Sequence, residues 1–191
     1  MAVDRTSGDR TELYIGLMSG TSLDGVDAVL ADFSSPAPRV LAHAHRPFPQ
    51  ELRAELLALA APGANEFERS GVAALRLVDL YAHCVADVLQ LADCAPADIC
   101  AIGAHGQTVR HRPAAGYSLQ LNAPARLAEL TQIDVVADFR SRDLAAGGQG
   151  APLVPAFHAA AFSAEAPRAV VNIGGISNVT YLPDGEQEVL G

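Results

Sequence analysis

The stretch from Tyr14 to Asp27 constrains the fold more than any other part of the sequence. It contains an apolar run, a turn of small residues with hydroxyl groups and a carboxylate, and a second apolar run that continues to Phe33. This order predicts a strand, a glycine-containing turn and a second strand. On spacing alone the turn has two interpretations: an ordinary tight hairpin, or a turn that binds phosphate.

The phosphate-binding interpretation gives each kind of group in the turn a role. Backbone N–H groups and hydroxyl groups would hold phosphate oxygens, and they come from Ser19, Gly20, Thr21 and Ser22. The carboxylates of Asp24 and Asp27 would serve a hydrated metal ion, because magnesium prefers oxygen ligands.

The composition predicts a globular domain with a substantial core. Half of the 191 residues are apolar and 18% are charged, which argues against wholesale disorder. No apolar run reaches the roughly 18 residues that span a bilayer, and the polar N-terminus lacks the apolar core of a signal peptide. We therefore expect a cytoplasmic protein that does not enter a membrane, with residues 1–11 as a flexible leader.

The charge and the cysteines exclude further classes of function. A net charge of −9 argues against a nucleic-acid partner, and it means that an anionic ligand must meet a local positive charge. The three cysteines, Cys84, Cys94 and Cys100, match neither a zinc spacing nor a disulfide framework. We expect them to be reduced thiols.

The order of apolar patterns predicts an α/β domain with a mixed sheet. Strands are expected over 13–18, 26–33, 39–46, 99–104, 117–121, 133–137, 168–173 and 179–182, and helices over 51–60, 65–92, 123–131 and 153–162. The buried face of the long helix is expected to include Phe67, Leu75 and Val78. His43 and His45 share one face of the third strand, but no third metal ligand is evident there.

Polar side chains gather where four of the expected strands end, after Met18, Ala104, Ala137 and Ile173. Ligand crevices of open α/β sheets lie at the carboxyl ends of strands, so we expect a binding site at this edge. The segment His105–Thr108 offers hydrogen-bond donors and acceptors beside a glycine, which suits a polyhydroxy ligand such as a sugar. An ordinary polar loop is the alternative.

Arg140 follows the strand expected over 133–137, and its guanidinium can hold a carboxylate through two nitrogen atoms. The alternative is a surface ion pair with Asp138 or Asp143, which would contribute little. A second glycine turn could hold the nucleotide or the sugar, and it contains Gly174, Gly175, Ser177 and Asn178. The sequence has no P-loop, no dinucleotide-binding glycine fingerprint and no nucleophile-elbow motif.

Five segments together resemble the anhydro-N-acetylmuramic acid kinase family. They are 16–27 (GLMSGTSLDGVD), 104–108 (AHGQT), 134–140 (DVVADFR), 145–155 (AAGGQGAPLVP) and 172–178 (NIGGISN). Each segment alone is a weak signal. They occur in the order of the family, however, and their combination is highly specific, which favours the phosphate-binding interpretation of the first turn.

The resemblance implies an actin-like ATPase (ribonuclease H-like) lobe, with a mixed sheet flanked by helices, as one of two lobes that enclose ATP. It also implies a reaction in which ATP and Mg²⁺ phosphorylate the 6-hydroxyl position of 1,6-anhydro-N-acetylmuramic acid while water opens the anhydro ring. The product would be N-acetylmuramic acid 6-phosphate, and the role would be the recycling of bacterial peptidoglycan.

By position, the resemblance implies two sets of binding residues. The ATP-phosphate segment would comprise Gly20, Thr21, Ser22, Leu23, Asp24, Gly25, Val26 and Asp27, with Asp24 nearest the magnesium ion. The sugar site would be lined by His105, Gly106, Gln107, Thr108 and Arg140. We infer that the lactyl carboxylate of the sugar is what Arg140 would bind.

The sequence departs from the family pattern at its end. The aspartate base of the family lies in an Asp-x-Gly-Pro turn directly after the segment that matches 188–191. We therefore expect the base just after Gly191, no clear catalytic residue within the chain, and little turnover by the chain alone. Residues 12–191 are expected to form the N-terminal lobe, with the second lobe as a missing partner. Its uncovered apolar face would then favour self-association, for example as a homodimer.

Two other functions remain open from the sequence. One is a non-catalytic module that binds a sugar or a nucleotide, and the other is a related sugar or acetate-type kinase of the same superfamily.

Overall fold

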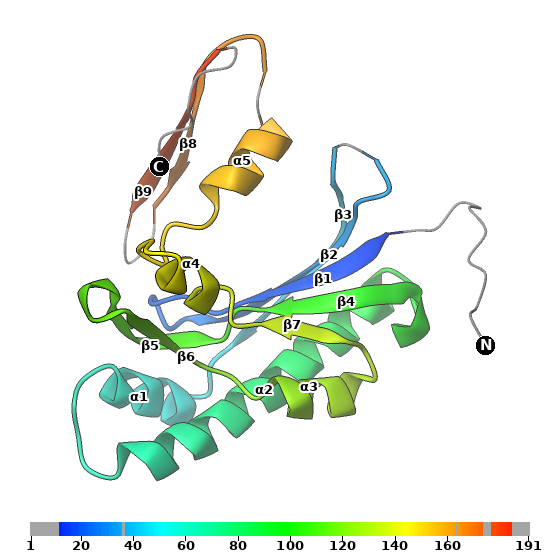
Figure 1. Cartoon of the computed structure of the whole chain (residues 1–191). Coiled ribbons are helices and arrows are strands. Elements are labelled where there is room, and N and C mark those ends of the chain that lie inside the picture. Colours follow the sequence, from blue (N-terminus) through cyan, green and yellow to red (C-terminus); the bar gives the residue numbers. More distant parts are fainter. Residues whose placement is uncertain (1–11, 36, 163, 174–176, 185–191) are drawn as a thin grey trace, which may run out of the picture.

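The central sheet has five strands in the spatial order β3-β2-β1-β4-β7, in a computed structural model that describes residues 12–35, 37–162, 164–173 and 177–184 (Figure 1). The bounds are β1 Leu13–Met18, β2 Gly25–Asp32, β3 Arg39–Pro47, β4 Ile99–Ala104 and β7 Val135–Ala137. Antiparallel pairing joins β1 to β2 and β2 to β3, whereas β4 runs parallel to β1 and β7 parallel to β4. This mixed sheet confirms the α/β class with a mixed sheet that the sequence predicts. The expected leader, 1–11, lies outside the described residues.

The first strand shows why the sequence folds in this way. Leu13, Ile15 and Leu17 are buried, and the residues between them are exposed, because successive side chains of a strand point to opposite faces. The register pairs Met18 with Asp27. Residues 19–24 therefore connect the two strands in a turn at the carboxyl end of β1.

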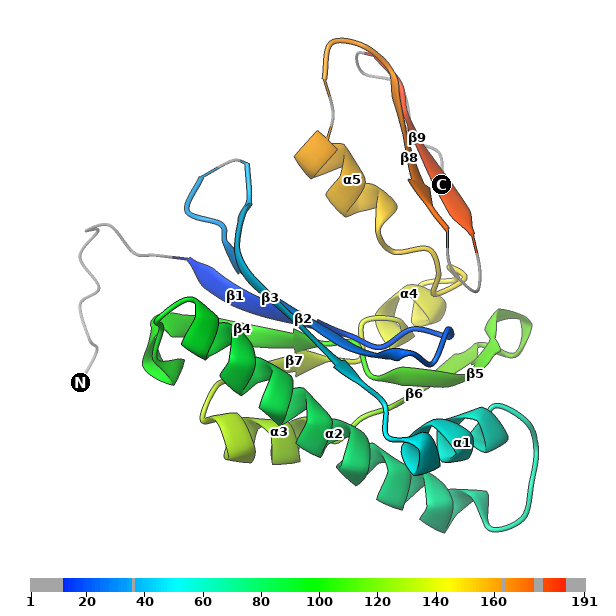
Figure 2. The ribbon, with the colours of Figure 1, turned by 180° about the vertical axis from the view of Figure 1, so that it is seen from behind.

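Three helices lie on one side of the sheet, as Figures 1 and 2 show from opposite sides. They are α1 Gln50–Leu59, α2 Glu66–Leu91 and α3 Pro124–Thr131. The long helix α2 contacts β2, β3, α1 and α3. Its Leu77, Val78 and Tyr81 pack against Ile15 and Leu30 of the sheet side in one continuous core, and each such apolar side chain stabilises the fold by about 1.5–3 kcal/mol.

The expected buried face of α2 is wrong in the first half of the helix. Phe67 is 98% exposed and Leu75 is 44% exposed, while Ala73, Ala74 and Leu77 are buried. In Figure 2 the first turns of α2 extend past the sheet and lie beside α1. Small residues are buried at this contact with α1, and the larger apolar side chains of the same turns lie on the solvent side.

Smaller elements complete the described chain. They are β5 Gln107–Arg112, β6 Tyr117–Leu121, α4 Ser141–Ala145, α5 Pro155–Phe162, β8 Arg168–Asn172, β9 Asn178–Leu182 and the 3-10 helices Pro96–Asp98 and Pro113–Ala115. Antiparallel hairpins form from β5 with β6 and from β8 with β9. The strand β5, the helix α4 and both 3-10 helices were not predicted from the sequence.

The second face of the sheet leaves apolar side chains exposed, among them Tyr14, Met18 and Val136. The elements α4 and α5 and the β8–β9 hairpin lie on this side of the sheet in both views (Figures 1 and 2). However, α5 contacts β9 and has no buried residue of its own. The part of the chain that the structure describes therefore leaves this face largely uncovered.

The structure describes Cys84, Cys94 and Cys100, and it places none of them in a disulfide. Among the described residues, no helix has the length and the apolar character needed to cross a membrane.

Candidate functional site

The turn between β1 and β2, residues 19–24, presents an ionised carboxylate at the edge of the sheet. Leu23 N donates to Gly20 O (3.2 Å), and Phe48 N donates to Asp24 O (3.1 Å). Asp24 Oδ1 accepts hydrogen bonds from Ser22 Oγ (2.9 Å) and Gly25 N (3.0 Å). The hydrogen bond from Ser22 is the main reason why the pKa of Asp24 lies below its usual value. The exposed Asp24 is therefore charged at neutral pH and fits a hydrated magnesium ion.

Ser19 does not offer its hydroxyl group to a ligand, which corrects the expectation from the sequence. The side chain is 2% exposed. Ser19 Oγ lies 3.2 Å from Gly106 O and 2.9 Å from the hydroxyl oxygen of Tyr81. A carbonyl oxygen only accepts, so Ser19 donates to Gly106 and the Tyr81 hydroxyl donates to Ser19. Burial raises the pKa of Tyr81 to about 12, so the phenol keeps its proton.

The other residues of the expected ATP segment fall into two groups. Thr21, Ser22 and Asp24 are exposed, whereas Leu23, Gly25 and Val26 are buried. At position 25 a Cβ would lie 2.3 Å from Arg46 O, so the glycine allows β3 to pass close to the turn. The exposed hydroxyl groups and the carboxylate of the turn are thus the groups that can meet a ligand.

Asp27 is engaged by the two histidines of β3. His43 Nε2 lies 2.9 Å and His45 Nδ1 lies 3.2 Å from Asp27 Oδ1. Within the described residues, no group of three or more His, Cys, Asp or Glu side chains is arranged to hold a metal ion. The structure therefore pairs these histidines with Asp27, and any magnesium ion would need phosphate oxygens and water as its other ligands.

The turn between β4 and β5, residues 105–106, lies beside the first turn and requires its glycine. Gly106 has φ +77°, and a Cβ there would lie 2.5 Å from Leu121 O. His105 Nδ1 lies 2.7 Å from Gly106 O. Because Gly106 O accepts, His105 carries its proton on Nδ1, and Nε2 is left to accept from Arg140 at 2.7 Å from Nη2.

Arg140 has no carboxylate partner in the described part of the chain. It donates to His105 Nε2 and to Gly150 O (2.6 Å). The two acids that were its alternative partners are engaged elsewhere: Asp138 accepts from Ser141 Oγ (2.6 Å), and Asp143 accepts from Gly150 N (2.7 Å). Burial lowers the pKa of Arg140, yet a guanidinium remains charged. A half-buried positive charge is therefore free to bind an anion.

Gln107 connects the two turns. Its side chain is 1% exposed, and Nε2 donates to Gly20 O (3.2 Å). The carbonyl oxygen Oε1 is buried without a hydrogen-bond partner among the described residues. Gln107 therefore holds the turns together and has one acceptor left for a ligand or a water molecule. Thr108 lies on the opposite face of the strand, where its Oγ1 accepts from Gln120 Nε2 (3.1 Å).

The second glycine turn lies only partly within the described residues. Gly174 and Gly175 are outside them, while Ser177 and Asn178 are exposed and half-buried at the start of β9. Asn178 pairs with Asn172 of β8. No described contact brings these two residues to the site formed by the other turns, and their role stays a prediction.

The expected place of the catalytic base is also outside the described part of the chain. The last residue that the structure describes is Asp184, and Gly191 lies beyond it. The structure therefore does not test the expectation that the base follows Gly191, and this expectation stays a prediction.

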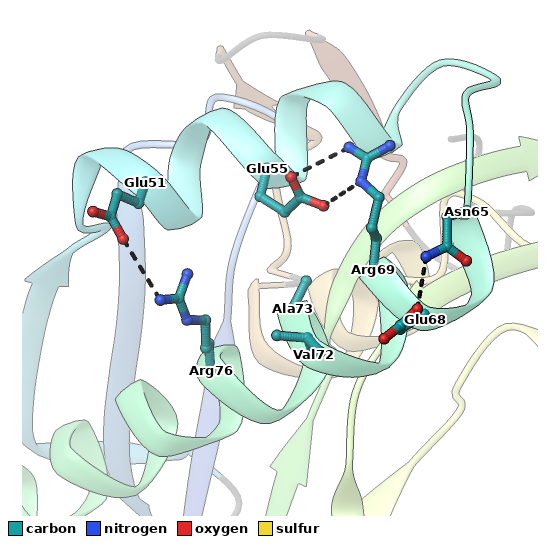
Figure 3. A pocket seen from close by; sticks show the side chains of 8 residues that line it. All are labelled: Glu51, Glu55, Asn65, Glu68, Arg69, Val72, Ala73 and Arg76. Atoms are coloured by element: carbon teal, nitrogen blue, oxygen red, sulfur yellow. Dashed lines mark hydrogen bonds and ion pairs between the residues drawn. The ribbon is translucent and has the colours of Figure 1, made fainter.

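A pocket of about 500 Å³ lies between α1 and α2, away from the two turns (Figure 3). Its charged groups satisfy one another: Arg69 binds Glu55 (2.7 Å), and Arg76 lies 3.5 Å from Glu51. Figure 3 also shows Asn65 directed toward Glu68, to which it donates a hydrogen bond. Both arginines that line the pocket are thus paired with carboxylates, which leaves no cation there for an anionic ligand. We therefore place the candidate site at the turns.

Sequence reasoning missed Arg53, and it saw Tyr81 only as a packing residue. Arg53 Nε on α1 donates to Leu23 O of the first turn (2.9 Å), and Tyr81 on α2 binds Ser19. Both contacts join residues far apart in the chain. No local pattern signals them, since each residue also suits an amphipathic helix.

The pKa of His105 predicts a pH-dependent stability. Burial lowers it most, and the charge of Arg140 lowers it further. Because the pKa of His105 is lower in the folded chain, the unfolded chain binds more protons. The contribution of neutral His105 to the free energy of unfolding is therefore present above the unfolded pKa and is lost as pH falls through the folded pKa. His105→Gln should therefore weaken the fall in urea-unfolding free energy between about pH 7 and pH 5. His83→Gln, at an exposed position, is the control, and an unchanged slope in the His105 variant would contradict the assignment.

The chain is similar to known proteins of one family. A family model described as anhydro-N-acetylmuramic acid kinase matches residues 12–191. A protein of that name from Bordetella pertussis is 62% identical over 184 residues, which cover 94% of this chain and 49% of the relative. Another from Albidiferax ferrireducens is 62% identical over 177 residues, which cover 90% of this chain and 46% of the relative. The chain thus spans about half the length of the curated relatives it matches.

One solved structure is also similar. A member of the Ppx/GppA protein family from Aquifex aeolicus matches 94% of this chain and 50% of that chain, with a TM-score of 0.42 and 11% sequence identity.

Proposed function

The chain belongs to the anhydro-N-acetylmuramic acid kinase family, and from this premise we propose that it supplies the substrate-binding half of an ATP-dependent sugar kinase. The proposed reaction transfers the γ-phosphoryl group of ATP to the 6-hydroxyl position of 1,6-anhydro-N-acetylmuramic acid, and water opens the anhydro ring. The observation that carries the proposal is that a carboxylate and a cation lie at two neighbouring, connected turns. An exposed, ionised Asp24 and a free Arg140 cation flank two turns that Ser19 and Gln107 join by hydrogen bonds.

The β1–β2 turn is the proposed phosphate side of the site. Thr21 and Ser22 would hold phosphate oxygens, and Asp24 would hold a magnesium ion through water or directly. When bound, the metal would neutralise the charge of the phosphates, which is the main demand of phosphoryl transfer. The network behind the turn fixes its backbone before the ligand arrives, so positioning costs less on binding.

The β4–β5 turn is the proposed sugar side of the site. The guanidinium of Arg140 would bind the lactyl carboxylate of the sugar, an anion in a protein whose net charge is −9. Gln107 Oε1, buried without a partner among the described residues, would accept a hydrogen bond from a sugar hydroxyl or from a bridging water. His105 would orient Arg140.

Ring opening needs a group that takes a proton from water, and His105 does not suit this role. Its Nδ1 donates to Gly106 O, and its Nε2 accepts from Arg140, so no lone pair is left for water. We therefore propose His105 as a positioning residue. Because the reaction consumes ATP, we place it in the bacterial cytoplasm, in the recycling of peptidoglycan.

A chimera tests the proposed reaction. Residues 12–184 of this chain would replace the matching half of the Bordetella pertussis relative, and ADP release would be followed with and without the anhydro sugar. Sugar-dependent ADP release at a rate near that of the unmodified relative is expected. A folded chimera that binds the sugar but releases no ADP would overturn the kinase proposal and favour a non-catalytic binding module. A preference for another sugar or for acetate would favour a related kinase.

We further propose that the uncovered face of the sheet is the contact surface for the remaining half of the protein. Tyr14, Met18 and Val136 are exposed there, and apolar patches of this kind mark interaction sites. The isolated chain is therefore expected to self-associate, with a sedimentation coefficient that rises with concentration. The double variant Tyr14→Gln, Met18→Gln should reduce this rise. A chain that stays monomeric at all concentrations would contradict the assignment.

A further inference from the structure

Arg53 is a second cation on the ligand side of the fold, and we propose that it binds the phosphate group that the β1–β2 turn receives. The inference rests on the proposed function, because it deepens the assignment of that turn. Nothing in the sequence pattern of α1 points to this role, and Arg53 belongs to none of the five segments that resemble the family.

Hydrogen bonds hold both the side chain and the backbone of Arg53. Its Nε donates to Leu23 O (2.9 Å), and its backbone N donates to Pro49 O (2.9 Å) at the start of α1. Just before the helix, Phe48 N donates to Asp24 O (3.1 Å). The first turn of α1 is therefore attached to the β1–β2 turn by two separate hydrogen bonds, one from the backbone and one from the guanidinium.

The backbone that Arg53 holds is strained, and strain of this kind clusters at functional sites. Leu23 has φ +55°, a left-handed conformation that is uncommon for a residue with a branched apolar side chain. Its side chain is 7% exposed, so burial of the leucine and the hydrogen bond from Arg53 hold the turn in this conformation. Such a conformation is unfavourable by itself and persists where the surroundings enforce it.

Most of the other arginines that the structure describes form ion pairs, and Arg53 does not. All 13 basic residues of the sequence are arginines. Six of those described form ion pairs with carboxylates: Arg39, Arg46, Arg69, Arg76, Arg110 and Arg126. The acids nearest to Arg53 along α1, Glu51 and Glu55, are the partners of Arg76 and Arg69 (Figure 3).

Arg53 itself has no ion pair among the residues that the structure describes, and its Nη1 and Nη2 atoms have no hydrogen-bond partner there. Arg140 is the matching case at the β4–β5 turn, where it contacts His105. Each of the two linked turns is thus contacted by one arginine that forms no ion pair with a described residue.

The chemistry of a guanidinium suits the proposed ligand. Nε is used to hold Leu23 O, and the two Nη groups remain as donors for phosphate oxygens. In a chain with a net charge of −9, a phosphate can be held only where local positive charge offsets the global field. Arg53 would supply that charge on one side of the turn, with Asp24 and its metal ion on the other.

Calorimetric titration of the 191-residue chain with Mg²⁺ and ADP, and separately with Mg²⁺ and inorganic pyrophosphate, tests the inference. Arg53→Met keeps an unbranched apolar stem but removes the charged guanidinium group, and it should weaken both affinities about tenfold or more. Arg53→Lys should recover part of the affinity. Arg76→Met is the matched control on the pocket side of α2, and it should change both affinities less than about twofold.

The outcomes separate the two proposals. If the unmodified chain binds the phosphate ligands and Arg53→Met binds them equally well, Arg53 has no phosphate contact and the proposed function stands. If the unmodified chain binds neither ligand, the proposed phosphate turn is wrong and the inference falls with it. A purely structural role for Arg53 would lower the temperature of unfolding in both Arg53 variants, with no recovery of affinity by lysine, and would also overturn the inference.

Discussion

Alanine in place of Gly106 is expected to destabilise the chain by about 3 kcal/mol, one of the larger effects a single substitution can have. Two causes add at this position: φ is +77°, and the new Cβ would lie 2.5 Å from Leu121 O and 3.2 Å from Asn122 Cβ. The first atom belongs to the backbone of β6 and cannot rotate away. Urea unfolding measures the free energy, and the temperature of unfolding should fall by roughly 10 °C.

Gly116→Ala is the matched control, because it separates the two causes. Gly116 also has a positive φ, +76°, but no atom lies within 4 Å of the position its Cβ would take. The control should therefore lose only the backbone contribution, about 1 kcal/mol. Equal losses of unfolding free energy in the two variants would show that the contact with Leu121 contributes nothing. They would contradict the close packing of the β4–β5 turn against β6.

Removal of the Arg140 charge is expected to weaken binding of the anhydro sugar by about 3 kcal/mol, which is roughly a hundredfold. In Arg140→Met the lactyl carboxylate of the sugar would enter a site with no neutralising cation. His105 Nε2, which now accepts from Arg140 at 2.7 Å, would also lose its partner. Calorimetry with the chain and the sugar measures the change.

The role of the carboxylate is isolated by a second ligand and a control variant. The anhydro sugar that lacks the lactyl group should bind the unmodified chain and Arg140→Met with similar affinities, because it has no anion to neutralise. Arg142→Met, two residues further along the chain at an exposed position, should leave the affinity for both sugars unchanged. Equal losses for the two sugars in Arg140→Met would mean that Arg140 shapes the site without binding the carboxylate.

The sequence was sufficient for those parts of the fold that depend on local pattern. The apolar run that ends at Met18 predicted a strand, and the small residues after it predicted a turn to β2. It was insufficient where pairing decides the structure. The segment Gln107–Arg112 is polar and was not predicted to be a strand, but it forms β5 because Tyr117–Leu121 pairs with it.

The candidate site shows the same division. The sequence indicated both turns and Arg140 as candidate parts of a site. It left open whether Arg140 pairs with Asp138 or Asp143, and the structure shows that both carboxylates accept other hydrogen bonds. The burial of Ser19 could not be predicted, since it depends on Tyr81, 62 residues away. Which groups of a turn face a ligand is decided by the elements packed behind the turn, and these are distant in sequence.

The position of Tyr81 also makes its intrinsic fluorescence a probe of the candidate site. The sequence contains four tyrosines and no tryptophan, so its intrinsic ultraviolet fluorescence comes from tyrosine alone. Tyr14, Tyr117 and Tyr181 are exposed, whereas Tyr81 is buried with its hydroxyl group on Ser19, directly behind both turns. A soluble quencher would extinguish the three exposed emitters and spare the buried one. The remaining emission would report on the junction of the two turns without any attached dye.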